Sequence, residues 1–293
     1  MNDSICFLDG KFMPLGAARI SPLDRGFLFA DGAYEVIPVY SRHPFRMDEH
    51  LRRLQASLDG IRLPNPYDAA TWRAFITRLI AETPFDDQSL YIQITRGADD
   101  KRDQPFPKGI SPTVFMFSAP LTAPTPEQRE SGVAAVTVPD IRWGRCDLKT
   151  VALLPNVLAR QSAVDAGCAE AVLIRDGFLT EGSASNIFVV KEGVILAPPK
   201  DHRMLPGITY DLVLELAAKH GAAHAVRMIP ESEIMDADEL WLTSSTKEVL
   251  AITTLDGKPV GKGEFAGKPG PLARQMHAWY CSFRDNVMRH GHG

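Results

Sequence analysis

The chain has 293 residues, of which 45% are hydrophobic and 23% are charged, and its formal net charge is −4. These proportions are typical of a globular protein with room for two domains that each bury a core. The acidic balance and the lack of a clustered basic stripe argue against a nucleic-acid-binding protein. No apolar stretch approaches the roughly 20 residues that span a bilayer, and residues 1–4 lack the basic start of a signal peptide. We therefore expect a cytoplasmic protein that binds neither nucleic acid nor membrane.

The first part of the chain is predicted to mix helices and strands. Asp9-Gly10 favours the tight turn of a hairpin between residues 5–8 and 11–13. Leu51, Leu54 and Leu58 recur at helical spacing. The predicted elements that follow the hairpin are a strand at 34–40, helices at 47–61 and 69–82, and strands at 90–95 and 113–118.

Residues 119–127 contain three prolines and show no hydrophobic periodicity. Such a segment is typical of a connection between domains. We therefore predict an N-terminal domain at 1–118, a linker at 119–127 and a C-terminal domain at 128–293.

The second part of the chain is richer in strands and hairpins. Asp176-Gly177 and Glu192-Gly193 are predicted turns. The predicted elements are strands at 133–138, 170–175, 186–190 and 239–243, and helices at 156–167, 208–220 and 271–289. Because strands outnumber helices and hairpins recur, we predict an α+β fold with mainly antiparallel sheets, and not a doubly wound parallel sheet.

Two runs stand out for their chemistry. Lys149 precedes the mostly apolar run 151–154, and Glu181 lies within Leu179-Thr180-Glu181-Gly182-Ser183. A lysine in such a position is more often a surface residue whose ammonium reaches water, and the alternative is a nucleophilic amine. A glutamate like Glu181, taken alone, is more often an exposed hairpin-turn residue.

Taken together, the runs 145–159 and 179–188 resemble the fold-type IV pyridoxal-phosphate (PLP) enzymes. This family includes branched-chain aminotransferases, D-amino-acid aminotransferases, (R)-amine transaminases and aminodeoxychorismate lyases. Further similar segments occur in family order at 24–36, 49–54, 95–97, 205–209 and 242–249. Arg-Cys-Asp-Leu-Lys-Thr at 145–150 and the run 91–97 are most similar to D-amino-acid aminotransferases. The resemblance implies two α/β domains with PLP in the interdomain cleft, and a homodimer whose active site is completed by the partner subunit.

The resemblance also implies how the cofactor is held. Lys149 would form the Schiff base and carry the proton, and Glu181 would pair with the pyridine nitrogen. Arg53 would pair with the phosphate, although its position off the leucine stripe also suits a solvated surface charge. The other residues implied to bind the cofactor are Leu205 and, in the proposed phosphate cradle, Ile208, Thr209, Ser244 and Ser245.

Elementary physics supports part of this cradle and leaves alternatives open. Residues 207–209 begin a predicted helix, whose free N–H groups favour an anion. Plain helix capping by Thr209 or its neighbours is as common. The hydroxyl-rich turn after strand 239–243 suits a phosphate, and it equally suits a helix N-cap box closed by Glu248.

Substrate recognition is implied for four residues. Tyr34 and Val36 lie in the Gly-x-Tyr-Glu-x segment, and Arg102 lies in the loop after Thr95-Arg96-Gly97. Gln104 stands where the D-amino-acid enzymes have a histidine, and it can donate a hydrogen bond but cannot carry charge. We therefore expect transfer from a D-amino acid, such as D-alanine or D-glutamate, to a 2-oxo acid, with weakened carboxylate binding. The alternatives are an (R)-amine transaminase, an aminodeoxychorismate lyase and a PLP-binding scaffold without turnover.

The remaining candidate ligands predict no metal site. Four widely separated cysteines form no Cys-x₂-Cys pair and are expected to be reduced. His220 and His224 have helical metal-pair spacing, but Gly221 marks a helix end between them. The other histidines form no recognisable metal-type cluster in the sequence: His43, His50, His202, His277, His290 and His292.

Overall fold

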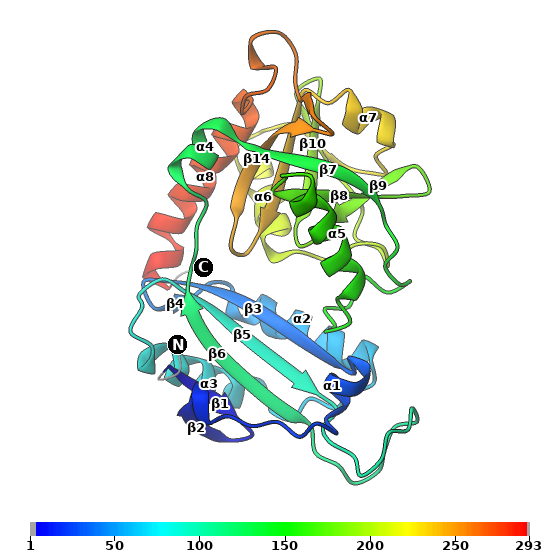
Figure 1. Cartoon of the computed structure of the whole chain (residues 1–293). Helices are drawn as coiled ribbons and strands as arrows, with labels where there is room; N and C mark the ends of the chain where they lie inside the picture. The colour runs from blue at the N-terminus through cyan, green and yellow to red at the C-terminus, as the bar shows by residue number, and fades with distance from the viewer. Residues whose placement is uncertain (1–3, 292–293) are drawn as a thin grey trace. The chain divides into compact units, whose positions relative to one another are not determined.

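The computed structural model describes residues 4–291, which form two compact units (Figure 1). Unit 1 comprises Met1–Leu121, Leu148–Ala152 and Val287–Gly293, and unit 2 comprises Thr122–Asp147 and Leu153–Asn286. The first break falls inside the proline-rich segment 119–127. In contrast to the predicted contiguous domains, two short later segments return to unit 1, because their contacts are with residues far away in sequence. Predictions that involve residues 1–3 and 292–293 lie outside the described residues.

Unit 1 is built on a six-stranded sheet within the described residues, in the order β2-β1-β6-β5-β3-β4. Its neighbouring strands all pair antiparallel. The β1–β2 turn has positive φ at Asp9 and Gly10, 47° and 86°, as a tight two-residue hairpin requires. The strands are β1 (Ile5–Leu8), β2 (Lys11–Pro14), β3 (Gly32–Tyr40), β4 (His43–Pro44), β5 (Gln88–Thr95) and β6 (Thr113–Pro120).

One face of this sheet carries the core of unit 1. Alternate β5 residues Leu90, Ile92 and Ile94 point to that face and pack with Leu54 and Leu58, because successive strand side chains point to opposite faces. The helices and short 3-10 turns of unit 1 are η1 (Leu15–Ala17), α1 (Arg25–Phe29), α2 (Met47–Gly60), α3 (Ala69–Glu82) and η3 (Met288–His290). The opposite face leaves alternate residues such as Tyr34 and Tyr91 half-buried.

Unit 2 contains a nine-stranded sheet within the described residues, in the order β12-β11-β10-β13-β14-β7-β8-β9 with β15 beside β14. Most pairs are antiparallel, whereas β11–β12, β14–β7 and β7–β8 are parallel. The strands are β7 (Val133–Pro139), β8 (Glu170–Arg175), β9 (Phe178–Gly182), β10 (Asn186–Lys191), β11 (Val194–Ala197), β12 (His224–Val226), β13 (Glu239–Ser244), β14 (Glu248–Leu255) and β15 (Lys258–Pro259). The predicted α+β class with mainly antiparallel sheets is therefore confirmed.

The helices of unit 2 follow their local sequence signals. Thr125 and Gln128 form a capping box at the start of α4, and Pro126 occupies the first turn, where its missing N–H costs nothing. The helices and 3-10 turn are α4 (Pro126–Ser131), α5 (Leu154–Asp165), α6 (Ile208–Lys219), α7 (Glu231–Met235), η2 (Gly263–Phe265) and α8 (Pro271–Asn286). Within residues 4–291, none of the helices has both the length and the apolar character that crossing a membrane would require.

Several boundaries differ from the predictions. Strand β14 was not predicted, and the hydroxyl-rich turn before it joins two strands and does not start a helix. Helix α4 begins inside the segment predicted as a linker. Helix α8 ends at Asn286, whereas the sequence predicted a helix through residue 289. Pairing and packing partners that are distant in sequence help to set such boundaries, and local periodicity does not encode them.

Candidate active site

The segment that carries Lys149 is bound to β3 and α2 in unit 1. Tyr34 N donates to Lys149 O at 2.9 Å, and Val151 N donates to Gly32 O at 3.1 Å. Lys149 N donates to Ser57 Oγ at 2.9 Å. The half-buried ammonium lies 4.0 Å from the centre of the Tyr34 ring, and within residues 4–291 it has no hydrogen-bond or ion-pair partner. The backbone is therefore fixed, while the amine stays available.

Arg53, predicted to hold a phosphate, is buried in unit 1 and paired with a carboxylate. Its Nε lies 2.9 Å from Glu35 Oε2 and its Nη2 lies 2.5 Å from Glu35 Oε1. Only 9% of Arg53 is exposed, so the alternative of a solvated surface charge is wrong. The fork-like geometry is the strong form of an arginine–carboxylate pair.

His50 completes this buried group. Its Nδ1 lies 3.2 Å from Glu35 Oε1. Burial lowers the pKa of His50. Burial also opposes ionisation of Glu35, but the charge and the two hydrogen bonds of Arg53 outweigh it and hold the pKa of Glu35 well below its usual range. We conclude that Glu35 is ionised and that Arg53 is its main partner.

Glu181 lies at the end of β9 in unit 2 and is buried, so it is not an exposed turn residue. Its carboxylate pairs with Arg142 Nη1 and accepts hydrogen bonds from Leu205 N and Asn186 Nδ2, both at 3.2 Å. Burial raises the pKa of Glu181 to about 7, against the opposing charge of Arg142. The carboxylate is thus rigidly held and titrates near neutral pH when it has no further cationic partner.

Arg142 is a site residue that the sequence reasoning missed. It also pairs with Asp140 at 2.8 Å and donates to Arg203 O at 2.9 Å. Burial opposes ionisation of Asp140, but its hydrogen bonds with Arg142 outweigh this and lower the pKa of Asp140 to about 2. The only local sequence signal was an arginine two residues after an aspartate at a strand end.

The start of α6 in unit 2 has the features of an anion site. Gly207 is the N-cap and offers no side-chain cap, and Thr209 does not cap the helix, so that alternative is wrong. The buried hydroxyls of Thr209 and Thr243 have no hydrogen-bond partner among the described residues. Free N–H groups at a helix N-terminus and unpaired buried hydroxyls suit a phosphate oxygen.

The remaining cradle residues lie in two segments of unit 2, the start of α6 and the β13–β14 turn. Ile208 and Thr209 are buried in the first turn of α6, and Leu205 is half-buried before it. Ser244 and Ser245 lie in the β13–β14 turn, where Ser244 Oγ accepts from Lys247 N at 3.1 Å. The alternative of a helix N-cap box closed by Glu248 is wrong, because Glu248 begins β14. The donors in this region fit the phosphate of PLP.

The residues predicted to bind substrate are only partly brought together. Tyr34 and Val36 lie half-buried on the same face of β3. Arg102 and Gln104 are exposed, with the Arg102 guanidinium 5.0 Å from the centre of the Phe29 ring. Within residues 4–291, no hydrogen bond, ion pair or ring contact joins Arg102 or Gln104 to Tyr34.

The loop that carries Arg102 is anchored by Arg25. Arg25 is 3% exposed and donates to the carbonyl oxygens of Asp103 at 2.5 Å and Gln104 at 2.8 Å. The Asp103 carboxylate pairs with Lys101 at 3.3 Å. Asp103 therefore does not occupy the Arg102 guanidinium.

One group of side chains contradicts the expectation that His277 belongs to no metal-type cluster. His277, Cys281 and Glu248 place one potential ligand atom each within 4.8 Å of the other two. The four-residue spacing of His277 and Cys281 was a usable signal. A histidine and a cysteine one helical turn apart match neither the paired-histidine nor the paired-cysteine spacing that predicts most metal sites.

Comparisons with known proteins identify the family of this chain. The family described as amino-transferase class IV matches residues 32–255. A D-alanine aminotransferase of Bacillus licheniformis is 37% identical over 268 residues, which cover 92% of this chain and 93% of that protein.

Solved structures show the same fold. The branched-chain amino acid aminotransferase of Escherichia coli superposes with a TM-score of 0.86 at 24% identity, covering 94% of this chain and 92% of that one. A fold IV-transaminase from Curtobacterium pusillum gives a TM-score of 0.78 at 26% identity, covering 92% of each chain. Fold-type IV is therefore confirmed for this chain.

Proposed function

Because the chain belongs to the amino-transferase class IV family, we propose that it uses PLP to transfer the amino group of a D-amino acid to a 2-oxo acid. The proposed specificity for D-amino acids rests on the 37% identity to a D-alanine aminotransferase over 92% of the chain. The branched-chain enzyme of Escherichia coli shares the fold at 24% identity, and fold alone says little about substrate. D-Alanine and D-glutamate are the proposed donors, and 2-oxoglutarate and pyruvate the proposed acceptors.

Lys149 is proposed to hold the cofactor and to move the substrate proton. When bound, PLP supplies an electron sink that stabilises negative charge on the α-carbon of the amino acid. The half-buried Lys149 amine lies 4.0 Å from the centre of the Tyr34 ring, and among residues 4–291 no carboxylate pairs with it. An amine in this state can act both as a nucleophile and as a proton carrier.

Glu181 is proposed to pair with the pyridine nitrogen. Its raised pKa, about 7 because of burial, is expected to fall when a cationic ring N–H approaches, since an opposite charge favours the ionised carboxylate. The hydrogen bonds from Leu205 and Asn186 orient the carboxylate before the cofactor arrives. Arg142 keeps part of the negative charge compensated.

The phosphate is proposed to bind at the start of α6 and at the β13–β14 turn. The supporting observations are the unpaired hydroxyls of Thr209 and Thr243 and the free N–H groups at the start of α6. Ser244 and Ser245 add hydroxyls from the turn. Arg53 is proposed as a phosphate partner on the resemblance alone, because in this structure its guanidinium pairs with Glu35 in unit 1.

We propose a homodimer in which the loop of one protomer completes the site of its partner. Arg102 is exposed, and it makes no contact with Tyr34 of its own chain among residues 4–291. A second copy is the simplest way to bring an arginine and a tyrosine to the same substrate carboxylate. Val36 would line the substrate side chain next to Tyr34.

The proposed reaction is tested with a panel of amino donors. Purified holoenzyme is mixed with D- and L-alanine, D- and L-glutamate, a branched-chain L-amino acid and (R)-1-phenylethylamine, and the first half-reaction is followed by the visible absorbance of the cofactor. We expect the D-amino acids to react fastest, and Lys149→Ala to abolish turnover. A clear preference for L-amino acids would refute the assignment.

An (R)-amine transaminase is the second candidate. It is favoured by one observation, the neutral Gln104 beside an exposed Arg102, because a weaker carboxylate trap tolerates donors without a carboxylate. Preference for the amine over every D-amino acid in the same panel would select this alternative. An aminodeoxychorismate lyase would instead release pyruvate without needing a 2-oxo acid.

A further inference from the structure

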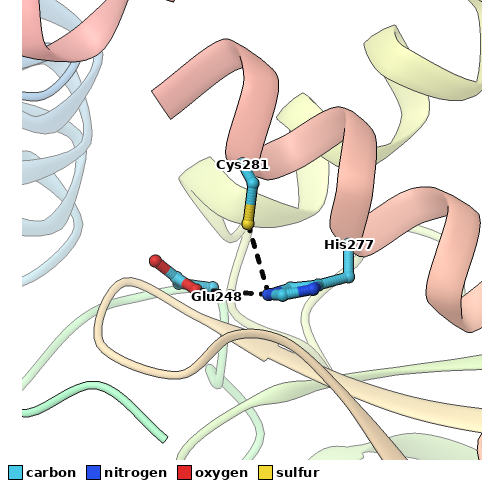
Figure 2. A group of neighbouring side chains, drawn as sticks. All are labelled: Glu248, His277 and Cys281. Atoms are coloured by element: carbon cyan, nitrogen blue, oxygen red, sulfur yellow. Dashed lines mark hydrogen bonds and ion pairs between the residues drawn. The ribbon is translucent and has the colours of Figure 1, made fainter. Parts of the chain in front are cut away.

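A second chemical cluster lies in unit 2, apart from the residues assigned to PLP. Glu248 begins β14, and His277 and Cys281 lie one turn apart on the same side of α8 (Figure 2). His277 Nε2 lies 3.4 Å from Cys281 Sγ and 3.7 Å from Glu248 Oε2. We propose that these three side chains form a binding site for a divalent cation that accepts sulfur, nitrogen and oxygen ligands, and that zinc fits it best.

The distances suit a tetrahedral metal. Zinc lies about 2.0–2.3 Å from its ligand atoms, which places neighbouring ligand atoms roughly 3.3–3.6 Å apart. The observed separations of 3.4 and 3.7 Å are close to two edges of such a tetrahedron, before any metal has drawn the ligands together. The helical four-residue spacing fixes the edge between His277 and Cys281. Three protein ligands leave the fourth position for water or a small solute.

The same geometry argues against a nucleophilic relay. In a Cys-His-carboxylate relay, one partner lies on each ring nitrogen of the histidine. Here both Cys281 and Glu248 face Nε2 of His277. Three atoms that converge in this way resemble a ligand set.

Two arginines lie beside Glu248, and their positive charges oppose the binding of a cation there. Arg129 pairs with Glu248 Oε2, and Arg284 Nη1 lies 2.9 Å from Glu248 Oε1. Each carboxylate oxygen has two lone pairs, so Oε2 can bind a metal while Arg129 keeps its hydrogen bond, as the outer partners of ligating carboxylates commonly do.

The charge change on binding is also modest. Asp285 pairs with Arg284 and compensates one of the two positive charges around Glu248. When zinc binds, the S–H bond of Cys281 breaks, an S–Zn bond forms, and the proton passes to the buffer. A dication enters and a proton leaves, so the local charge rises by a single unit.

A metal at this site would link two elements of unit 2. Glu248 pairs with Ser244 in the β13–β14 register, so a metal on Glu248 would tie α8 to the turn that carries Ser244 and Ser245. This inference does not depend on the proposed reaction, because metal binding can be measured without turnover.

Metal binding is tested on the PLP-loaded, chelator-treated full chain. Co²⁺ is added as a spectroscopic probe, and we expect one equivalent to give tetrahedral ligand-field bands at wavelengths longer than those of the cofactor. Zn²⁺ should displace it, and calorimetry should give one strong Zn²⁺ site. Cys281→Ser and His277→Gln are each expected to weaken Zn²⁺ at least about tenfold.

Cys168→Ser is the matched control, since Cys168 is also half-buried in unit 2 but lies outside the cluster. This variant should bind like the wild type. Circular dichroism shows whether each variant is folded, and His277→Gln keeps the test valid if Cys281→Ser is not. The inference fails if no tetrahedral spectrum appears, or if it persists unchanged in folded Cys281→Ser and His277→Gln. It also fails if Cys168→Ser loses it, or if Cys281 reacts with a thiol reagent at the same rate with and without Zn²⁺.

Discussion

Replacing Arg142 with methionine is expected to destabilise unit 2 and to change how Glu181 titrates. Arg142 is 6% exposed at its side chain and pairs with two buried carboxylates, Glu181 and Asp140. Methionine keeps much of the apolar stem but has no charge. The variant therefore leaves Glu181 without its main cation, whereas Asp140 keeps Arg175 at 2.9 Å.

The loss of stability and its pH dependence can both be estimated from these contacts. Breaking a buried ion pair by removing one partner costs about 3–5 kcal/mol. Burial raises the pKa of Glu181 from 4.5 to about 7. Ionised Glu181 thus already lowers the stability of the PLP-free chain by about 3 kcal/mol above pH 7. Because the folded pKa lies above the unfolded one, this loss develops as the pH rises from about 4.5 to 7.

In the Arg142→Met variant the pKa of Glu181 rises further, so the added loss should be greater at pH 8 than at pH 5. Urea unfolding of the PLP-free protein at both pH values, followed by circular dichroism, measures it. Arg175→Met is the matched control, because it removes a partner of Asp140 and leaves the Glu181 contact intact. The reasoning would be refuted if Arg142→Met cost less than about 1 kcal/mol, or if both variants showed the same pH dependence.

Three further outcomes are expected. Glu35→Gln should lower the free energy of unfolding, measured with urea at pH 7, by about 3–5 kcal/mol. Because the folded pKa of Glu35 is lowered, this difference from wild type should shrink as the pH falls below about 4.5. A difference that does not change with pH would contradict the buried ion pair. A randomly exchanged 1:1 mixture of Lys149→Ala and Arg102→Ala should regain roughly a quarter of wild-type activity if the loop acts across the dimer, because half of the dimers are mixed and each has one intact site; no recovery would place Arg102 in its own protomer's site. Gly207→Ala, whose Cβ would collide with a buried amide side chain, should weaken PLP at least about tenfold in equilibrium dialysis, whereas Gly144→Ala, in open space, should not.

Local sequence patterns predicted the elements whose cause is local. The Asp9-Gly10 turn and the stripe of Leu51, Leu54 and Leu58 appear where the sequence places them. Strand β14 was missed because its pairing with β13 and β7 lies outside its own sequence. The return of residues 148–152 to unit 1 was missed for the same reason, since their hydrogen bonds are with β3 and α2.

In the candidate site, too, the features that depend on partners distant in sequence were not predicted. The resemblance indicated Glu181 and Arg53, but it did not predict the charged partners with which each of them is buried. Arg53 pairs with a residue 18 positions away and Arg142 with one 39 positions away. Such pairs depend on strand register and helix placement, which a single sequence does not specify. Roles that depend on a bound cofactor, such as that of Arg53, stay predictions.

One amide joins the two parts of the proposed cofactor site that lie in unit 2. Asn186 Nδ2 donates to Glu181 Oε2 at 3.2 Å and to Leu205 O at 3.0 Å, and Leu205 N donates to Glu181 Oε1 at 3.2 Å. Asn186 Oδ1 lies against Gly207, where a side chain would have no room. The carboxylate proposed for the pyridine nitrogen and the helix start proposed for the phosphate therefore share one buried hydrogen-bond network. Because the buried Asn186 amide cannot shift without losing both of its hydrogen bonds at once, we expect the spacing between the proposed pyridine and phosphate positions to be set before the cofactor binds.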